Sequence, residues 1–162
     1  MNDQIDREIL KIIQQDARIS NAEIARQIGL AASATLERIR KLEERGVIEG
    51  YVTKVDPAEL GFGLTAFISM KTQDYCDETD KSLAEIPEVL EVHDVAGEDS
   101  YLLKVRVKNT KALSKLLREA FNKVPNVIST KTTVVLETIK ETISLPIEDI
   151  KNGKKEKKTR KK

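Results

Sequence analysis

The first 45 residues carry apolar side chains at helical spacing. Ile5, Ile9, Ile12 and Ile13 recur every three or four residues. This spacing predicts an amphipathic helix with one buried face, and Asp3 stands where a side chain caps the first backbone amides.

A second helix is predicted between Ser20 and Gly29. Ser20 and Glu23 have the spacing of a capping box, in which each side chain binds a backbone amide at the helix start. Gly29 tolerates the left-handed conformation that ends many helices. A third helix is expected at about residues 32–45, and residues 47–52 are expected to turn into a strand. This order indicates a helix-turn-helix domain with a small, winged-helix-like strand.

The third predicted helix separates apolar from polar positions. One face is expected to be buried, because its side chains fall together at 100° per residue. This face holds Thr35, Leu36, Ile39 and Leu42. The remaining candidates for contact with DNA are Ser33, Ala34, Glu37, Arg38, Arg40 and Lys41. In this fold the N-terminal half of the third helix meets base edges, so we expect the first three to read bases and the three cations to hold phosphates.

After a glycine cluster at residues 61–63, some segments have apolar residues at every second position, as in strands, and others have them at helical spacing. The expected strands are residues 64–71, 89–95, 101–108 and 127–138, and the expected helices are residues 77–86 and 110–123. The order βαββαβ is that of a ferredoxin-like α+β domain, with both helices on one face of a four-stranded sheet. We expect Phe67, Leu103 and Val105 to leave the other face apolar, and a second copy of the chain is its simplest cover.

These patterns divide the chain into four parts. They are a helix-turn-helix DNA-binding domain at residues 1–50, a connecting strand and linker at 51–63, a βαββαβ domain at 64–143, and a basic disordered tail at 144–162. The uncovered sheet face makes the βαββαβ domain an oligomerisation domain, and the family resemblance given below implies that it is also a ligand-binding domain. Residues 151–162 carry eight basic side chains and one acidic one, although the whole chain has a net charge of only +1. Such a tail is expected to serve as an arm for a polyanion. An appendage that only aids solubility is the alternative.

Composition excludes several classes of protein. No apolar run approaches the ~18 residues of a membrane span, and no signal peptide is visible. A single cysteine, Cys76, leaves no internal disulfide and fits a reducing cytoplasm. A single histidine, His93, offers poor support for a metal site or a Ser–His relay. We therefore expect a cytoplasmic protein without a metal, a cofactor or catalytic residues.

Short motifs between residues 3 and 143 resemble those of the Lrp/AsnC (feast/famine) transcription regulators. The matching runs are Asp3-Gln4-Ile5-Asp6-Arg7-Glu8-Ile9-Leu10, Glu23-Ile24-Ala25, Arg38-Ile39-Arg40-Lys41-Leu42-Glu43, Gly46-Val47-Ile48-Glu49-Gly50-Tyr51, and Gly97 followed by Tyr101-Leu102-Leu103. The sequence departs from the family at two places. Ala31-Ala32 stand where the family usually has Ser-Pro, and Ser100 stands where its loop usually has Asp.

The resemblance implies a homodimer, with an octamer as a larger assembly, that binds a pseudo-palindromic site on double-stranded DNA. It also implies an amino acid or similar small effector bound beside a loop of the C-terminal domain. The candidate effector residues are Gly97, Glu98, Asp99, Ser100 and Tyr101 in this loop and Thr132 on the last strand. Polar side chains and loop amides offer donors for a carboxylate and acceptors for an ammonium group. A plain turn that only faces water is the alternative.

Two other functions fit parts of the sequence. In its two-domain architecture the chain also resembles sirohaem decarboxylases. Those enzymes, however, tend to carry an Ile-Arg-Arg run after the helix-turn-helix and several histidines. This chain has Ile48-Glu49-Gly50 and His93 alone. An architectural DNA-packing protein would also use a basic tail, and it would differ in the ratio of specific to non-specific affinity. A sequence-specific transcription regulator is the function expected first.

Overall fold

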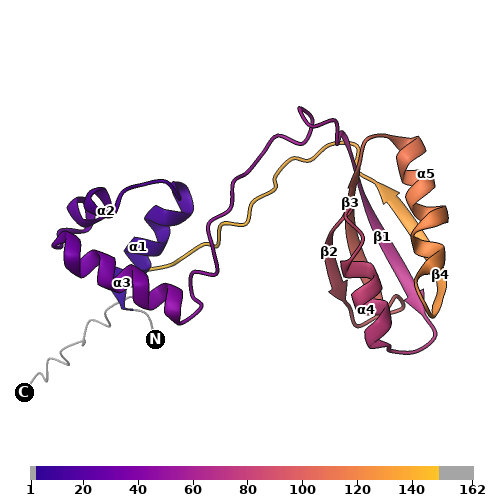
Figure 1. The fold of residues 1–162 in the computed structure, drawn as a ribbon, viewed down its shortest axis with the longest axis horizontal. Coiled ribbons are helices and arrows are strands. Elements are labelled where there is room, and N and C mark those ends of the chain that lie inside the picture. The colour runs from indigo at the N-terminus through magenta and orange to yellow at the C-terminus, as the bar shows by residue number, and fades with distance from the viewer. Residues whose placement is uncertain (1–2, 150–162) are drawn as a thin grey trace, which may run out of the picture. The chain divides into compact units, whose positions relative to one another are not determined.

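The computed structural model describes residues 3–149, which form parts of two compact units. Of the described residues, 3–54 and 142–149 belong to the first unit, and residues 55–141 form the second (Figure 1). Residues 142–149 therefore associate with the N-terminal domain, although residues 144–149 were expected to belong to the tail. The basic residues 151–162 lie outside the described residues. No described helix is long and apolar enough to cross a membrane.

Three helices build the first unit: α1 (Gln4–Gln15), α2 (Asn21–Ile28) and α3 (Ala32–Glu44). Their apolar faces meet in a small core, in which each side chain is at most 4% exposed. The core consists of Ile9, Ile24, Ile39 and Leu42. Leu36 is 52% exposed, so the prediction that it faces inward is wrong. Residues 47–54 are not part of any strand in the described chain, so the expected wing strand does not form here.

The predicted helix boundaries of α1 and α2 are confirmed by their caps. The carboxylate of Asp3 accepts a hydrogen bond from the Asp6 amide at 2.9 Å, and the Ser20 hydroxyl accepts one from the Glu23 amide at 3.2 Å. Gly29 ends α2 with φ 69°. Of the two hydrogen bonds of the capping box, only the one from the Glu23 amide to Ser20 forms. The Glu23 carboxylate binds Arg26, at 2.5 and 2.9 Å, instead of the amide at the helix start.

The second unit is the predicted ferredoxin-like domain. Its elements are β1 (Leu64–Thr72), α4 (Asp77–Ala84), β2 (Val89–Asp94), β3 (Tyr101–Val107), α5 (Thr110–Glu119), a 3-10 turn η1 (Phe121–Lys123) and β4 (Val127–Val134). The four strands pair antiparallel in the order β2-β3-β1-β4. Leu83 of α4 and Leu113 and Leu116 of α5 join one buried core with the strands, so both helices cover the same face (Figure 1).

The two faces of the sheet differ from the expectation in one respect. Leu103 and Val105 are fully buried under the helices, so the prediction that they lie on the uncovered face is wrong. Side chains alternate along a strand, and the uncovered face therefore receives Lys104 and Arg106 from β3. Phe67 lies opposite Lys104 in the pairing of β1 with β3 and is 38% exposed, as expected for this face.

Candidate DNA interface and effector loop

The start of α3 is exposed and lacks a side-chain cap. Ala31 occupies the cap position and makes no side-chain hydrogen bond to the helix, in keeping with the missing Ser-Pro pair. Ser33 and Ala34 are exposed on this first turn. Thr35 is fully buried, and its hydroxyl donates to the Ala31 carbonyl at 3.1 Å. The buried side of α3 thus packs into the domain, and its outer side is exposed to solvent.

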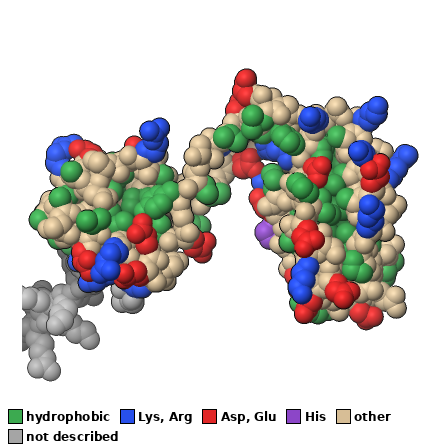
Figure 2. Space-filling model, in the orientation of Figure 1, with side chains coloured by type: hydrophobic (Ala, Val, Ile, Leu, Met, Phe, Trp, Pro, Cys, Tyr) green, Lys and Arg blue, Asp and Glu red, His purple; other side chains and the backbone are tan. Residues whose placement is uncertain are grey.

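Charged side chains on the outer side of α3 pair with one another. Arg40 lies 3.0 Å from Glu37 and 2.6 Å from Glu44, and Lys41 lies 3.5 Å from Glu37. The Arg40 guanidinium holds the pKa of Glu37 below its usual range. Acidic and basic side chains lie next to one another along the edges of this domain, around a hydrophobic and uncharged middle (Figure 2). Exposed pairs of this kind are weak, so phosphates can replace the carboxylates at little cost.

Arg38, predicted as a phosphate contact, pairs with carboxylates of the same domain. Its guanidinium binds two carboxylates at the start of α1, Asp3 at 2.8 Å and Asp6 at 2.7 Å. Asp6 is 9% exposed. The backbone amide of Asp6 and the Arg38 guanidinium hold the pKa of Asp3 below its usual value. Arg38 therefore ties α3 to α1, and its charge is compensated within the domain.

A notch of about 360 Å³ runs along α3. It is lined by Asp6, Ala34, Glu37, Arg38, Lys41, Leu42 and Arg45. Arg45 was missing from the predicted contacts, although it follows Lys41 by four residues and so shares its side of the helix. The notch joins predicted base-reading and phosphate-binding residues into one surface.

The candidate effector loop is a tight connection between β2 and β3. The Ser100 amide donates to the Met70 carbonyl at 2.8 Å, and the Val95 amide donates to the Ser100 carbonyl at 3.0 Å. The Ser100 hydroxyl accepts from the amide and the hydroxyl of Thr72, at 3.1 and 2.9 Å. Ser100 therefore fixes the loop to the end of β1, and Thr72 is a partner that sequence reasoning missed. Alternation along β1 places Thr72 on the helix-covered face and could have suggested it.

The other candidate effector residues are divided between water and the core. Gly97 and Glu98 are exposed, and Asp99 is half-buried. Tyr101 is 3% exposed, and its hydroxyl donates to Asp80 of α4 at 2.5 Å. Burial and the Asp80 carboxylate raise the pKa of Tyr101 well above its usual value. The phenol thus stays protonated and bound inside the domain.

Thr132 lies apart from the loop in the sheet. It pairs with Ile68 of β1, and β1 separates its strand, β4, from β3. Within one chain, the structure therefore does not bring Thr132 and residues 97–101 onto neighbouring strands.

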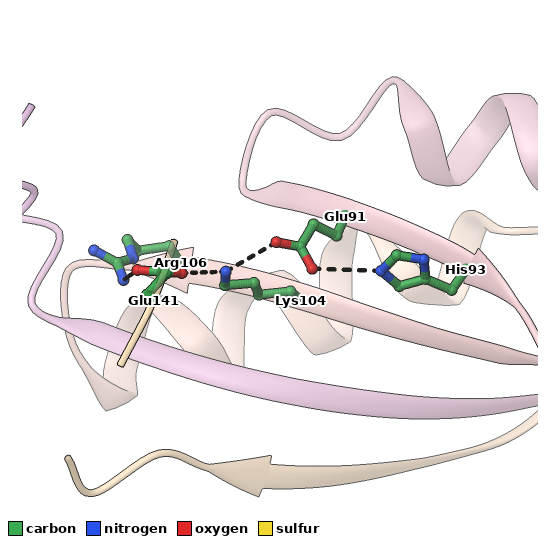
Figure 3. Close-up of polar contacts among 5 residues, drawn as sticks. All are labelled: Glu91, His93, Lys104, Arg106 and Glu141. Carbon is green, nitrogen blue, oxygen red and sulfur yellow. Dashed lines mark hydrogen bonds and ion pairs between the residues drawn. The ribbon is translucent and has the colours of Figure 1, made fainter. Parts of the chain in front are cut away.

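The uncovered face of the sheet carries a network of charges (Figure 3). Lys104 binds Glu91 at 2.9 Å and also binds Glu141, while Arg106 lies 3.4 Å from Glu141. His93 lies 3.4 Å from Glu91. The Lys104 ammonium holds the pKa of Glu141 below its usual value. The face beside Phe67 is thus polar and internally paired. Within residues 3–149, no cluster of His, Cys, Asp or Glu is suited to hold a metal ion.

Comparisons with known proteins match both units. Residues 2–49 match the family model for a winged helix-turn-helix DNA-binding domain, and residues 65–145 match that for the Lrp/AsnC ligand-binding domain. The chain is 40% identical to the HTH-type transcriptional regulator FL11 of Pyrococcus horikoshii, over 90% of this chain and 96% of that protein. It is 38% identical to the leucine-responsive regulatory protein of Escherichia coli, over 90% of this chain and 91% of that one.

A solved structure shares the fold of most of the chain. The crystal structure of a transcriptional regulator from Neisseria meningitidis in complex with L-methionine superposes with a TM-score of 0.85 at 30% identity, covering 90% of this chain and 97% of that one. These relatives are regulators, so the sirohaem-decarboxylase alternative is not supported. With its helix-turn-helix, its ferredoxin-like domain and these similarities, the chain belongs to the Lrp/AsnC family of DNA-binding transcription regulators.

Proposed function

We propose that the protein is a dimeric, amino-acid-responsive regulator in which α3 reads the major groove of DNA. The observation that supports this most is the exposed outer side of α3, where a notch is lined by Ala34, by the carboxylates of Asp6 and Glu37 and by three cations. Ser33 and Ala34 lie in the N-terminal half of the helix, which meets base edges in helix-turn-helix proteins. Such a protein works in the compartment that holds the DNA, which for a bacterial or archaeal cell is the cytoplasm.

Four residues on the outer side of α3, and Arg45 at its end, have proposed tasks. Ala34 is small enough to contact a thymine methyl group, and Glu37 can accept from a cytosine amino group. Arg40 and Lys41 hold phosphates, which fixes the position of the helix on the duplex. Arg45 joins them at the far end of the notch.

Glu37→Ala is expected to change which bases the protein prefers. Loss of a base-specific acceptor removes about 1–3 kcal/mol of discrimination at one position of each half-site. Binding measured against a set of singly substituted operators tests this. Glu44→Ala is the matched control, because it also removes one carboxylate paired with Arg40 but lies at the end of α3. The control should leave the base preferences unchanged. An identical profile for wild type and Glu37→Ala would remove Glu37 from the readout.

We propose a homodimer as the minimal assembly, formed by the uncovered sheet faces. Paired α3 helices then imply a pseudo-palindromic operator with half-sites about 10 bp apart or a multiple of that spacing. A dimer, or an octamer built from dimers, buries Phe67 and the charge network beside it.

Sedimentation equilibrium at micromolar concentration should therefore show a dimer or a larger species. Phe67→Asp should shift the protein toward monomer, because it replaces an apolar contact by a charge that loses its water in the interface. Tyr75→Asp removes an exposed aromatic side chain that binds Asp80 of α4, on the helix side of the sheet, and should leave the assembly intact. A wild-type protein that sediments as a stable monomer contradicts the proposal.

We propose that the effector is an amino acid held near residues 97–101. The matching family model is that of a ligand-binding domain, one relative is named as leucine-responsive, and one structural neighbour was crystallised with L-methionine. Glu98 and Asp99 offer carboxylates for an ammonium group, and the loop amides offer donors for a carboxylate. Thr132 contributes to the same pocket only if it comes from another copy of the chain, so the site requires assembly.

The melting temperature and the DNA affinity should respond to at least one of the twenty amino acids, with a coupling of about 1–3 kcal/mol between effector and DNA. Asp99→Asn should weaken the response. Asp74→Asn, which neutralises a carboxylate outside the loop, serves as its control. If none of the twenty shifts either quantity, the protein works without an amino-acid effector. A ratio of specific to non-specific affinity near one would instead favour the architectural DNA-packing alternative.

A further inference from the structure

Polar side chains on one face of α1 bind residues 145–149, the segment that follows the C-terminal domain. Gln4, Arg7, Lys11 and Gln14 recur every three or four residues and so share this face. Gln14 forms a two-point clamp on the main chain: its side-chain amide donates to the Leu145 carbonyl at 3.2 Å, and the Leu145 amide donates to its carbonyl oxygen at 2.6 Å. The Gln14 side chain thus binds both the amide and the carbonyl of Leu145, as a residue of a neighbouring β-strand would.

The other end of the segment is held by charge. Arg7 donates to the Glu148 carbonyl at 2.7 Å, and Lys11 lies 2.5 Å from the Asp149 carboxylate. Gln4 donates to the same oxygen of Asp149 at 2.7 Å. Lys11 and Gln4 together hold the pKa of Asp149 below its usual value. Asp149 is therefore ionised and attached at neutral pH.

Apolar contact accompanies these bonds. Ile147 is half-buried, and residues 143–148 close one side of a hollow of about 790 Å³. Its other walls come from α1 and from the segment after α3, including Leu10, Ile13, Val47 and Ile48. Residues 145–149 are thus held on the DNA-binding domain both by hydrogen bonds and by apolar contacts.

The attachment of residues 145–149 determines how many residues of chain link the basic arm, residues 151–162, to the last bound residue before it. Seven residues separate Asp149 from the middle of the arm at residue 156. Without the attachment, the last anchored residue is Glu141 on the sheet, which is fifteen residues away. The effective concentration of a tethered group falls roughly as the −3/2 power of the tether length, so a tether of fifteen residues in place of seven lowers the concentration of the basic residues around their anchor about threefold.

We propose that this face of α1, comprising Gln4, Arg7, Lys11 and Gln14, is a docking site for residues 145–149, and that docking roots the basic arm on the DNA-binding domain. The arm's contribution to DNA affinity then depends on the clamp. The second half of this inference rests on the proposed DNA-binding function, whereas the docking itself does not.

Hydrogen exchange in the full-length protein tests the docking directly. The Leu145 amide should exchange slowly in the wild type and at the rate of a free peptide in Gln14→Ala, which removes its acceptor. Gln15→Ala is the matched control, because it makes the same chemical change one residue further along α1 on an exposed side chain. It should leave Leu145 protected. Free exchange of Leu145 in the wild type overturns the proposal.

DNA titrations test the consequence. Gln14→Ala is neutral in charge and should weaken DNA binding about threefold per arm in the full chain. In a background lacking residues 151–162 it should have no effect. An equal loss with and without the arm shows that Gln14 acts through the folded domain, which overturns the rooting of the arm. A wild-type protein that binds no DNA but protects Leu145 refutes the proposed function and leaves the docking intact.

Discussion

Deletion of residues 151–162 should lower DNA affinity more than any single substitution in α3. The deleted segment carries eight basic and one acidic side chain and no apolar one. On duplex DNA each neutralised phosphate adds about 0.9 to the slope of log affinity against log salt, so an arm that engages half of its cations contributes about 3.6. Between 50 and 200 mM salt, a slope of that size changes affinity on the order of a hundredfold.

Titrations at several salt concentrations, with matched and mismatched DNA, measure this effect. The deletion should lower specific and non-specific affinity together, because contacts to phosphates read no bases, and the preferred sequence and the effector response should persist. Replacing the basic residues by Gln at constant length is the control for chain length and should reproduce the deletion. If the truncated protein binds as tightly as the wild type at low salt, the segment only aids solubility.

Arg38→Ala should destabilise the DNA-binding domain by about 2 kcal/mol. The substitution leaves the carboxylate of Asp6 largely buried without its cation, and an unpaired buried charge is costly. Arg40→Ala removes the same type of side chain from exposed pairs on the same helix and should cost at most about 0.5 kcal/mol. Urea unfolding of the full-length variants, followed by circular dichroism, compares the two.

A double-mutant cycle locates the cause. Asp6→Asn combined with Arg38→Ala should cost less than the sum of the two single substitutions, because the pair is already broken in either one. Where Arg38→Ala is fully folded, its salt slope on DNA should equal that of the wild type, in contrast to Arg40→Ala. Equal stability losses in Arg38→Ala and Arg40→Ala would return Arg38 to the role of a phosphate contact.

Local signals predicted most of the fold because they depend on neighbouring residues. The caps at Asp3 and Ser20, the turn at Gly29 and the alternation along β3 all formed as expected. Leu36 could not be placed in this way, because its exposure depends on how far the α1–α3 packing reaches around the helix.

The errors in the sheet have a similar origin. Alternation shows that Leu103 and Lys104 lie on opposite faces, but not which face the helices cover. In β2 the pairing register shifts between Val89 and Glu91. This irregularity places Val89 against the core and Glu91 on the open face, although strict alternation would group them together.

The sequence predicted which helix and which loop form the candidate sites, but not the hydrogen bonds and ion pairs of their residues. The exposed start of α3 and the loop after β2 follow from the pattern of the chain. The partners of Arg38 lie thirty-two and thirty-five residues away, and Thr72 lies twenty-eight residues from Ser100. No local spacing encodes such pairs, because tertiary packing creates them.

The carboxylates paired with Arg40 and Lys41 bear on how the protein finds its operator. Because Arg40 and Lys41 are already paired with Glu37 and Glu44, we expect the proposed phosphate contacts of α3 to exchange one set of ion pairs for another, with a small net gain in free energy. If the basic residues 151–162 bind phosphates as proposed, we expect them to contribute most of the affinity for random sequence, and α3 to add affinity where the bases match. We then expect a short residence time at wrong sites and a long one at the operator.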